Sequence, residues 1–178
     1  MKNKTPNILQ IFVFAFFISS YIYLAIFYYS HRNTDFPQPK SNIVAQPINS
    51  TEKVIRVIDG DTFVIEGNLS VRLIGMDTPE MKNKNNKIDC FAQEAKNKLT
   101  SMISGKEVAL VKDISETDRY GRLLRYVYLG DEMVNDTLVK EGYAVIATFP
   151  PDVKHENEFL ASEKMARASN LGLWSACK

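Results

Sequence analysis

Apolar and polar residues alternate through the middle of the chain in the pattern of short β-strands. The first such run alternates around β-branched side chains, and Asp-Gly and Gly-Asn turns separate it from the next two. Closely spaced strands with turn residues between them predict a β-meander. The strands predicted in this way cover residues 53–58, 62–66, 69–74, 107–111, 123–129 and 143–147.

Helical periodicity replaces this alternation in three segments, where apolar residues recur every three or four positions. The predicted helices cover residues 91–103, 134–141 and 153–169. In the last of them we expect Phe159, Leu160 and Met165 to form the inner face. Five of these six strands, together with about three inserted and appended helices, predict an α+β protein that is mainly a β-barrel. This arrangement is typical of the OB-fold, a small Greek-key barrel that often binds oligonucleotides.

The N-terminal part of the chain has a different character. Residues 8–29 contain no charged side chain, and this length is enough to cross a bilayer core, which needs about 20 apolar residues. Lys2 and Lys4 precede the run, so the positive-inside rule predicts that residues 1–7 lie in the cytoplasm. We favour a transmembrane helix that anchors the protein. A cleaved signal peptide and secretion remain the alternative, although its apolar part is usually only about 7–15 residues long.

Residues 30–50 are polar and contain three prolines, which is typical of an extended linker. The folded domain is then expected over residues 51–178, outside the cytoplasm. This part has 18 lysine and arginine residues against 20 aspartate and glutamate residues, a formal charge of −2. Broad electrostatic capture of nucleic acid by a basic face is therefore not expected.

The chain has two cysteines, Cys90 and Cys177. Two cysteines far apart in sequence do not by themselves suggest a zinc site. In an exported domain they permit a disulfide, and two free thiols are the alternative.

Three short motifs combine carboxylates with arginines. They are Asp-Gly-Asp-Thr at 59–62, Arg-Leu-Ile-Gly-Met-Asp-Thr-Pro-Glu at 72–80 and Asp-Arg-Tyr-Gly-Arg at 118–122. Carboxylates can hold a hard cation, and guanidinium groups neutralise charge that develops on phosphoryl oxygens. The motifs therefore predict a site that cleaves phosphodiesters.

In order and approximate spacing these motifs resemble the staphylococcal nuclease (thermonuclease) family, and Asn-Leu-Gly-Leu-Trp at 170–174 resembles its C-terminal end. The resemblance covers roughly residues 51–175. It implies an OB-fold and a calcium-dependent endonuclease that hydrolyses DNA and RNA and leaves 3′-phosphate ends.

The resemblance also implies a role for particular residues. Two carboxylates and one backbone carbonyl bind Ca²⁺, two arginines contact the phosphate, and a glutamate acts as the general base or positions the attacking water. The corresponding residues are Asp61, Asp77 and Thr78 for the metal and Arg72, Glu80 and Arg122 for catalysis.

Substrate contacts outside this set are less specific. Tyr120 is expected to touch a nucleotide phosphate or stack on a base, with a packing role as the alternative. Lys82 and Lys84 lie in a polar loop and either clamp a strand or remain solvated. Thr148 stands where the family often has a base-pocket tyrosine, and Phe149 beside it could still offer an aromatic face.

Other charged residues near the motifs have simpler interpretations. Asp59 is expected to build the turn that it occupies, because aspartate hydrogen-bonds to nearby backbone in turns. Arg119 and Arg125 are predicted to be surface charges.

The second function that we consider is a non-catalytic, membrane-tethered module that binds nucleic acid on the same barrel. All five catalytic and carboxylate positions of the family pattern are intact, which argues against this alternative. The catalytic domain is expected to be monomeric.

Overall fold

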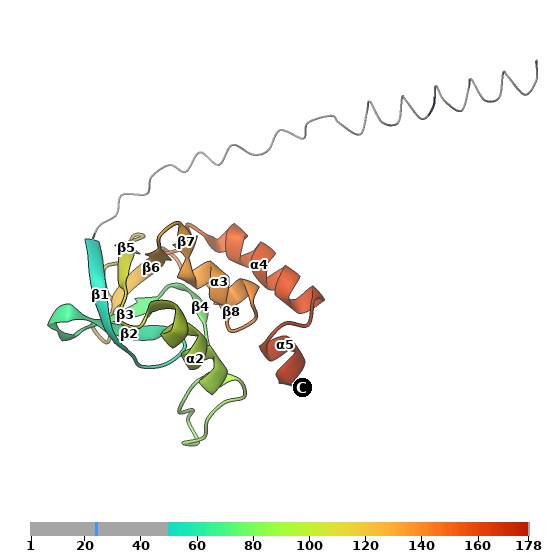
Figure 1. Ribbon diagram of the computed structural model, residues 1–178, viewed down its shortest axis with the longest axis horizontal. Helices are drawn as coiled ribbons and strands as arrows, with labels where there is room; N and C mark the ends of the chain where they lie inside the picture. The colour runs from blue at the N-terminus through green and yellow to red at the C-terminus, as the bar shows by residue number, and fades with distance from the viewer. Residues whose placement is uncertain (1–23, 25–49, 178) are drawn as a thin grey trace, which may run out of the picture. The chain divides into compact units, whose positions relative to one another are not determined.

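The computed structural model describes residue 24 and residues 50–177 (Figure 1). In chain order its elements are β1 (Ser50–Val57), β2 (Thr62–Ile65), η1 (Glu66–Asn68), β3 (Leu69–Leu73), β4 (Gly75–Asp77), α2 (Ala92–Ile103), β5 (Glu107–Val111), β6 (Leu123–Leu129), β7 (Glu132–Met133), α3 (Val134–Lys140), β8 (Val145–Ala147), α4 (Glu156–Ala168) and α5 (Leu173–Ala176). Apart from residues 24 and 50, the predicted membrane segment and linker lie outside the described residues. No helix within the described part has the length and hydropathy needed to cross a bilayer.

A closed five-stranded barrel forms the centre of the domain. Strand β1 pairs antiparallel with β2 on one side and with β5 on the other, and antiparallel pairing also joins β2 to β3 and β5 to β6. A parallel pairing between β3 and β6 closes the barrel. This is the strand order of the predicted OB-fold. The two-residue strand β7 extends the sheet beyond β6.

The barrel strands contribute apolar side chains to the core, some from one face only, as in β3, and β2 from both faces. Phe63, Val71 and Val127 are fully buried in the barrel interior. On the opposite faces Ile55 and Leu69 are more than half exposed. Burial of the inward apolar side chains supplies most of the stabilising free energy, at about 25 cal/mol per Å² removed from water.

The predicted strand at 69–74 is confirmed as β3 to within one residue, and a further short strand that was not predicted follows it. Strand β3 ends at Leu73, and β4 begins at Gly75 and pairs with β8 instead of continuing in the barrel. Gly75 has φ of +83°, and a Cβ there would lie 2.2 Å from a ring carbon of Phe159. The positive φ and the lack of space favour glycine at this turn, and the turn leads into β4, which carries Asp77.

The three predicted helices are confirmed as α2, α3 and α4, with ends that differ by a few residues. The short 3₁₀ turn η1 and the four-residue helix α5 were not predicted. Helix α4 begins at Glu156 and not at 153. The reason is that the N–H of Lys154 donates to the Asp113 carboxylate, which holds this residue in the preceding loop.

The predicted inner face of α4 is only partly correct. Phe159 is buried, but Leu160 and Met165 are 48% and 53% exposed. The buried stripe consists of Phe159, Ser162, Glu163 and Ala166. Polar residues can occupy it because they have partners: Ser162 donates to Asp136, and Glu163 accepts the N–H of Ile146.

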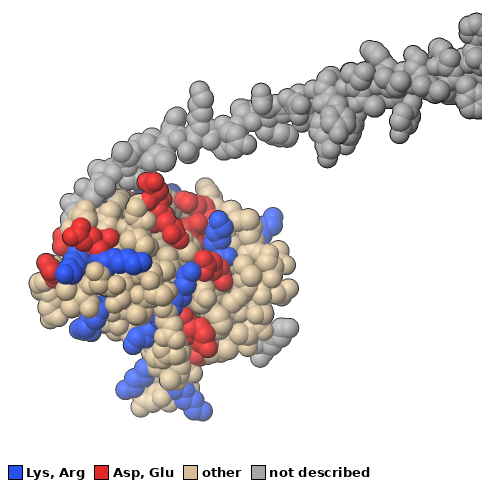
Figure 2. Space-filling model, viewed as in Figure 1, with Lys and Arg blue, Asp and Glu red and all other residues tan. Residues whose placement is uncertain are grey.

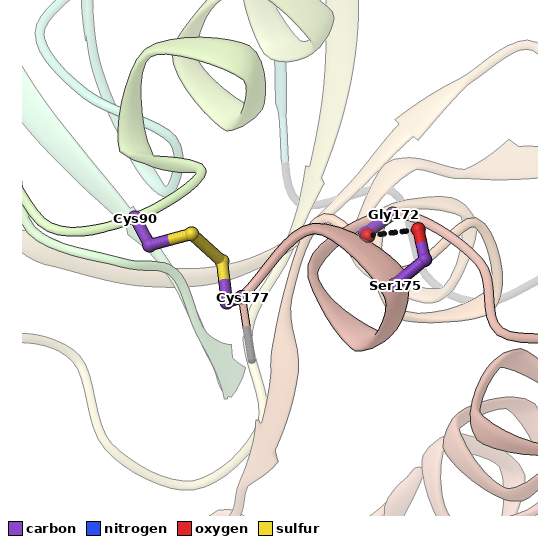
Figure 3. The surroundings of a disulfide bond; sticks show 4 residues. All are labelled: Cys90, Gly172, Ser175 and Cys177. Atoms are coloured by element: carbon purple, nitrogen blue, oxygen red, sulfur yellow. Dashed lines mark hydrogen bonds between the residues drawn. A yellow bond between two sulfur atoms is a disulfide. The ribbon is translucent and has the colours of Figure 1, made fainter.

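A disulfide joins Cys90 to Cys177, 87 residues later in the chain, with their Cα atoms 5.8 Å apart (Figure 3). Both cysteines of the chain are therefore used, and the alternative of two free thiols is not realised. Cys90 directly precedes the first turn of α2, and Cys177 follows α5. The bond ties the approach to α2 to the C-terminal end of the domain.

Candidate active site

Asp61 lies in the tight turn between β1 and β2. The Asp59 carboxylate accepts the N–H of Asp61 at 3.1 Å, which confirms the turn-building role predicted for Asp59. At Gly60 a Cβ would lie 2.6 Å from the hydroxyl oxygen of Thr78, so this position has no room for a side chain. The close approach at Gly60 brings Asp61 next to Thr78.

Neutral donors and one cation surround the buried carboxylate of Asp61. Its Oδ2 accepts the backbone N–H of Thr78 at 3.2 Å and the Thr78 hydroxyl at 3.0 Å. Its Oδ1 accepts the Thr62 hydroxyl at 2.9 Å, and Nη1 of Arg72 forms an ion pair with Oδ2. Burying an ionised carboxylate is costly without such partners, and together they fix its orientation.

Arg72 lies in the middle of β3, and its guanidinium reaches two carboxylates. One nitrogen pairs with Asp61, and Nη2 lies 2.6 Å from Oδ1 of Asp77 on β4. The side chain is only 17% exposed. The two carboxylates predicted to bind metal therefore flank a single guanidinium, which itself lines a pocket.

Asp118 builds the turn that presents Arg122. Its Oδ1 accepts the N–H groups of Tyr120 at 2.9 Å and Arg122 at 3.0 Å, and its Oδ2 accepts Nε of Arg122 at 2.7 Å. Burial acts to raise the pKa of Asp118, but these hydrogen bonds outweigh burial and leave the pKa below its usual value. The carboxylate stays ionised and holds the arginine in place.

Thr62 connects the two arginines. Nη1 of Arg122 lies 3.4 Å from the Thr62 hydroxyl oxygen, and the same hydroxyl donates to Asp61. The resulting chain of contacts runs from Arg122 through Thr62, Asp61 and Arg72 to Asp77. No role was predicted for Thr62 or Asp118. The available signal was their position inside the first and third motifs.

Glu80 is exposed and follows the β4 segment. Its backbone N–H donates to the Asp89 carboxylate at 3.2 Å, and its carbonyl accepts the Asp89 N–H at 3.0 Å. Partial burial, followed by the negative charges of Asp59 and Asp77, raises the pKa of Glu80. The carboxylates of Glu80, Asp59 and Asp77 are therefore close enough for their charges to interact. A raised pKa makes a carboxylate a better proton acceptor near neutral pH.

A pocket of about 450 Å³ opens beside the two arginines. Arg72 and Arg122 line it, together with Tyr120 and Phe149, which are 69% and 74% exposed. Both rings are available for stacking on a base. Thr148 is not among the residues that line the pocket. Its hydroxyl donates to the Glu156 carboxylate on α4 at 2.8 Å.

Lys82 and Lys84 lie on the segment that joins β4 to α2. Both are exposed, and neither is among the residues that line the pocket. This segment projects at the bottom of Figure 2, where basic side chains gather, whereas both signs of charge mix over the rest of that face. A direct contact of these lysines with substrate stays a prediction.

Arg125 was predicted to be a surface charge, and this is wrong. It is 7% exposed and forms an ion pair with Glu116, and its Nη1 donates to the carbonyls of Glu116 and Leu124. Its partner Glu116 lies nine residues earlier, in the loop that precedes β6, so the pairing has no local pattern in the sequence. Arg119 is exposed, as predicted, and its guanidinium lies 4.9 Å from the centre of the Tyr120 ring.

Asp152 fastens the loop that presents Arg122. Its buried Oδ1 accepts the N–H groups of Ile114 at 2.9 Å and Ser115 at 2.8 Å. Burial acts to raise the pKa of Asp152, but these hydrogen bonds outweigh it, and the pKa lies below its usual value. A depressed carboxylate pKa stabilises the fold above the unfolded-state value of about 4, and this contribution is lost as the pH falls through the folded-state value.

We expect Asp152→Ala to lower the free energy of unfolding at pH 7 by about 2–3 kcal/mol, because it leaves two N–H groups without their charged acceptor. The difference from wild type should shrink as the pH is lowered below 4 in urea unfolding measurements. Asp152→Asn keeps an acceptor oxygen, so its free energy of unfolding at pH 7 should lie between those of wild type and Asp152→Ala. Equal stability of Asp152→Ala and wild type at pH 7 would contradict the anchoring role.

The residues predicted to bind metal are of a suitable chemical type. Asp61 and Asp77 offer carboxylate oxygens on either side of one guanidinium, and the Thr78 carbonyl belongs to the chain segment that binds Asp61. Calcium takes such hard oxygen ligands and completes its shell with water. Among residues 24 and 50–177, no group of three or more His, Cys, Asp or Glu side chains is arranged to hold a metal ion. The two carboxylates and the carbonyl are oxygen donors of the type that suits a hard cation.

Comparison with known proteins matches residues 70–176 to the family model described as "Staphylococcal nuclease homologue". The match includes the second and third motifs and the C-terminal helices.

Individual relatives agree with this match. The chain is 37% identical over 139 residues to a thermonuclease of Staphylococcus hyicus, covering 76% of this chain and 82% of that protein. It is 35% identical over 156 residues to a thermonuclease of Staphylococcus intermedius, covering 86% of this chain and 92% of that protein. It is also 34% identical over 125 residues to endonuclease YncB of Bacillus subtilis, covering 67% of this chain and 59% of that protein.

Proposed function

This chain belongs to the staphylococcal nuclease family, and from this premise we propose that it hydrolyses phosphodiester bonds in nucleic acids. The observation that carries the proposal is the chain of contacts from Arg122 to Asp77, which joins two arginines and two carboxylates beside one pocket.

The two arginines are proposed to stabilise the transition state. Each guanidinium can donate two hydrogen bonds to phosphoryl oxygens. Both line the pocket, and each is already oriented: Arg122 by Asp118, and Arg72 by Asp61 and Asp77. Donors that are oriented before the reaction need no reorganisation as charge develops, and this is a large source of rate enhancement.

Glu80 is proposed to accept a proton from the attacking water, or to position that water. Its carboxylate lies within electrostatic reach of Arg72 and Asp77, and this position beside the two groups supports the role. Its exposure leaves it accessible to solvent and substrate.

The proposal includes Ca²⁺ as the metal. Asp61 and Asp77 would hold it through their carboxylates, and Thr78 through its backbone carbonyl. Bound there, the ion would supply positive charge against the negative charge that develops on the phosphoryl oxygens.

The substrate scope follows from the family. We propose that the protein cleaves single-stranded or locally opened DNA, and RNA, and leaves 3′-phosphate ends. The exposed rings of Tyr120 and Phe149 support stacking on unpaired bases, which does not depend on base identity.

We further propose that the domain works outside the cytoplasm, held by an N-terminal transmembrane helix or released after signal cleavage. The disulfide between Cys90 and Cys177 supports an oxidising compartment, because such bonds are rare where thiols are kept reduced.

The test is the initial rate of cleavage of labelled single-stranded DNA and RNA by the purified full-length protein. It is measured with Ca²⁺, with Mg²⁺ and with a calcium chelator, and the product ends are identified by mass spectrometry. We expect cleavage with Ca²⁺, loss of cleavage with the chelator and 3′-phosphate products. Binding without cleavage under every metal condition would overturn the proposal in favour of a non-catalytic binding module.

A further inference from the structure

Residues 80–89 form a loop that closes on itself at the position of Glu80. Glu80 and Asp89 are its two ends, and they exchange two hydrogen bonds: backbone N–H to carboxylate at 3.2 Å, and backbone N–H to carbonyl at 3.0 Å. The backbone of Glu80 therefore depends directly on where Asp89 lies.

Asn83 organises the interior of this loop. Its Oδ1 accepts the N–H groups of Asn85 and Lys87, and its Nδ2 donates to Oδ1 of Asp89 at 2.8 Å. The hydrogen bonds of Asn83 thus run to other residues of the loop. The loop has an ordered interior, but its position relative to the barrel is decided at its ends.

The end at Asp89 is held by covalent and apolar contacts just beyond it. Cys90 is bonded to Cys177, and the ring of Phe91 packs against Tyr143 with centroids 5.5 Å apart. The partner segment is itself fixed, because the N–H of Leu173 donates to the carbonyl of Gly142 at 2.9 Å. Figure 3 shows the disulfide between the α2 side and the end of α5.

From these contacts we propose that Asp89 is a positioning residue for Glu80, and that the Cys90–Cys177 disulfide holds Asp89 where it can do so. The inference rests on the function proposed for Glu80. It assigns the disulfide a role in turnover in addition to stability. Reduction by a dithiol, which converts the bond to two thiols as the dithiol is oxidised, should release the loop end and displace Glu80.

The first measurement compares kcat and KM of the full-length protein with its Asp89→Ala and Cys90→Ser/Cys177→Ser variants. Small displacements of a catalytic group cost up to about 100-fold in rate, so we expect kcat to fall by about 10- to 100-fold. KM should change little, because the pocket residues lie on other elements. Asp89→Asn keeps an acceptor oxygen and should recover part of the loss. Dithiothreitol should lower kcat of wild type and leave the double serine variant unchanged.

A second readout is independent of nuclease activity. Trypsin cleaves after lysine, and the loop carries Lys82, Lys84 and Lys87. Mass spectrometry of the first cuts should show faster cleavage at these lysines in Asp89→Ala and in the reduced protein. Val108→Ala, in the barrel core, serves as the matched control: it lowers the melting temperature without touching the loop. It should leave both kcat and loop cleavage near wild type at a temperature where it stays folded.

Two results would overturn the inference. One is an unchanged kcat in both the reduced protein and Asp89→Ala, and the other is loop cleavage that is no faster than in wild type. If the wild-type protein cleaves no nucleic acid, the proposed function fails instead, and the trypsin result still decides whether the disulfide and Asp89 hold the loop.

Discussion

Replacing Arg122 with alanine is expected to lower kcat for nucleic-acid cleavage by about 10³- to 10⁵-fold, the range seen when an arginine that stabilises phosphoryl transfer is removed. Its guanidinium lies 3.4 Å from the Thr62 hydroxyl and lines the pocket next to Arg72. The loss should appear mainly in kcat, since the interaction strengthens as charge develops on the phosphate. Rapid-quench kinetics of single-stranded DNA cleavage would measure it.

Two comparison variants separate this effect from loss of charge or of structure. Arg122→Lys keeps the charge but not the paired N–H groups and should recover only part of the rate. Arg56→Ala removes an exposed arginine from β1, away from the pocket, and should leave kcat unchanged. The backbone of the turn should survive in Arg122→Ala, because Asp118 also binds the N–H of Tyr120. A fall of less than tenfold in Arg122→Ala would argue against a transition-state role.

Replacing Glu80 with glutamine is expected to lower kcat by about 10²- to 10⁴-fold, which is the usual contribution of a general acid or base. Glutamine keeps the size of the side chain but cannot accept the proton. Substrate affinity should stay the same or rise slightly, because one negative charge near the phosphate is removed. Fluorescence anisotropy with labelled DNA, alongside the cleavage assay, would measure both quantities.

Glu94→Gln provides the matched control for Glu80, since Glu94 is an exposed glutamate on α2 that makes no contact with the pocket. It should behave as wild type. The pH profile adds a further criterion: if Glu80 is the base, the acidic limb of the kcat profile should disappear in Glu80→Gln. A retained acidic limb together with a small loss of rate would assign proton removal to another group.

The local parts of the fold were predictable from the chain alone. The strands at 107–111 and 123–129 have the predicted limits, because runs rich in apolar and β-branched or aromatic residues between turn residues are visible in neighbouring positions. The parallel contact between β3 and β6 has no such local signal, since it depends on the closure of the whole barrel. Strand β4 was not predicted for the same reason, because its partner β8 lies far along the chain and Gly75 packs against the ring of Phe159, 84 positions later.

The functional site was likewise predictable only in part. The motifs named the residues that the structure brings together around Arg72 and Arg122. The residues that hold these side chains in place were not predicted. Thr62 contacts Arg122, which is 60 positions later in the chain, and Asp89 binds the backbone of Glu80. Arg125 was misjudged because its partner Glu116 is nine residues away across a loop. Sequence spacing indicated the chemistry of the site but not the contacts that hold it.

The disulfide also makes part of the chain into a covalent ring. A single peptide-bond break anywhere between Cys90 and Cys177, including the turn that carries Arg122, leaves two fragments that are still joined through sulfur. A break between Glu80 and Asp89 lies outside the ring and separates the fragments covalently. Cleavage by a protease at one site in most of the C-terminal half should therefore leave the molecule joined, and the cleaved molecules should be visible on a gel only after reduction.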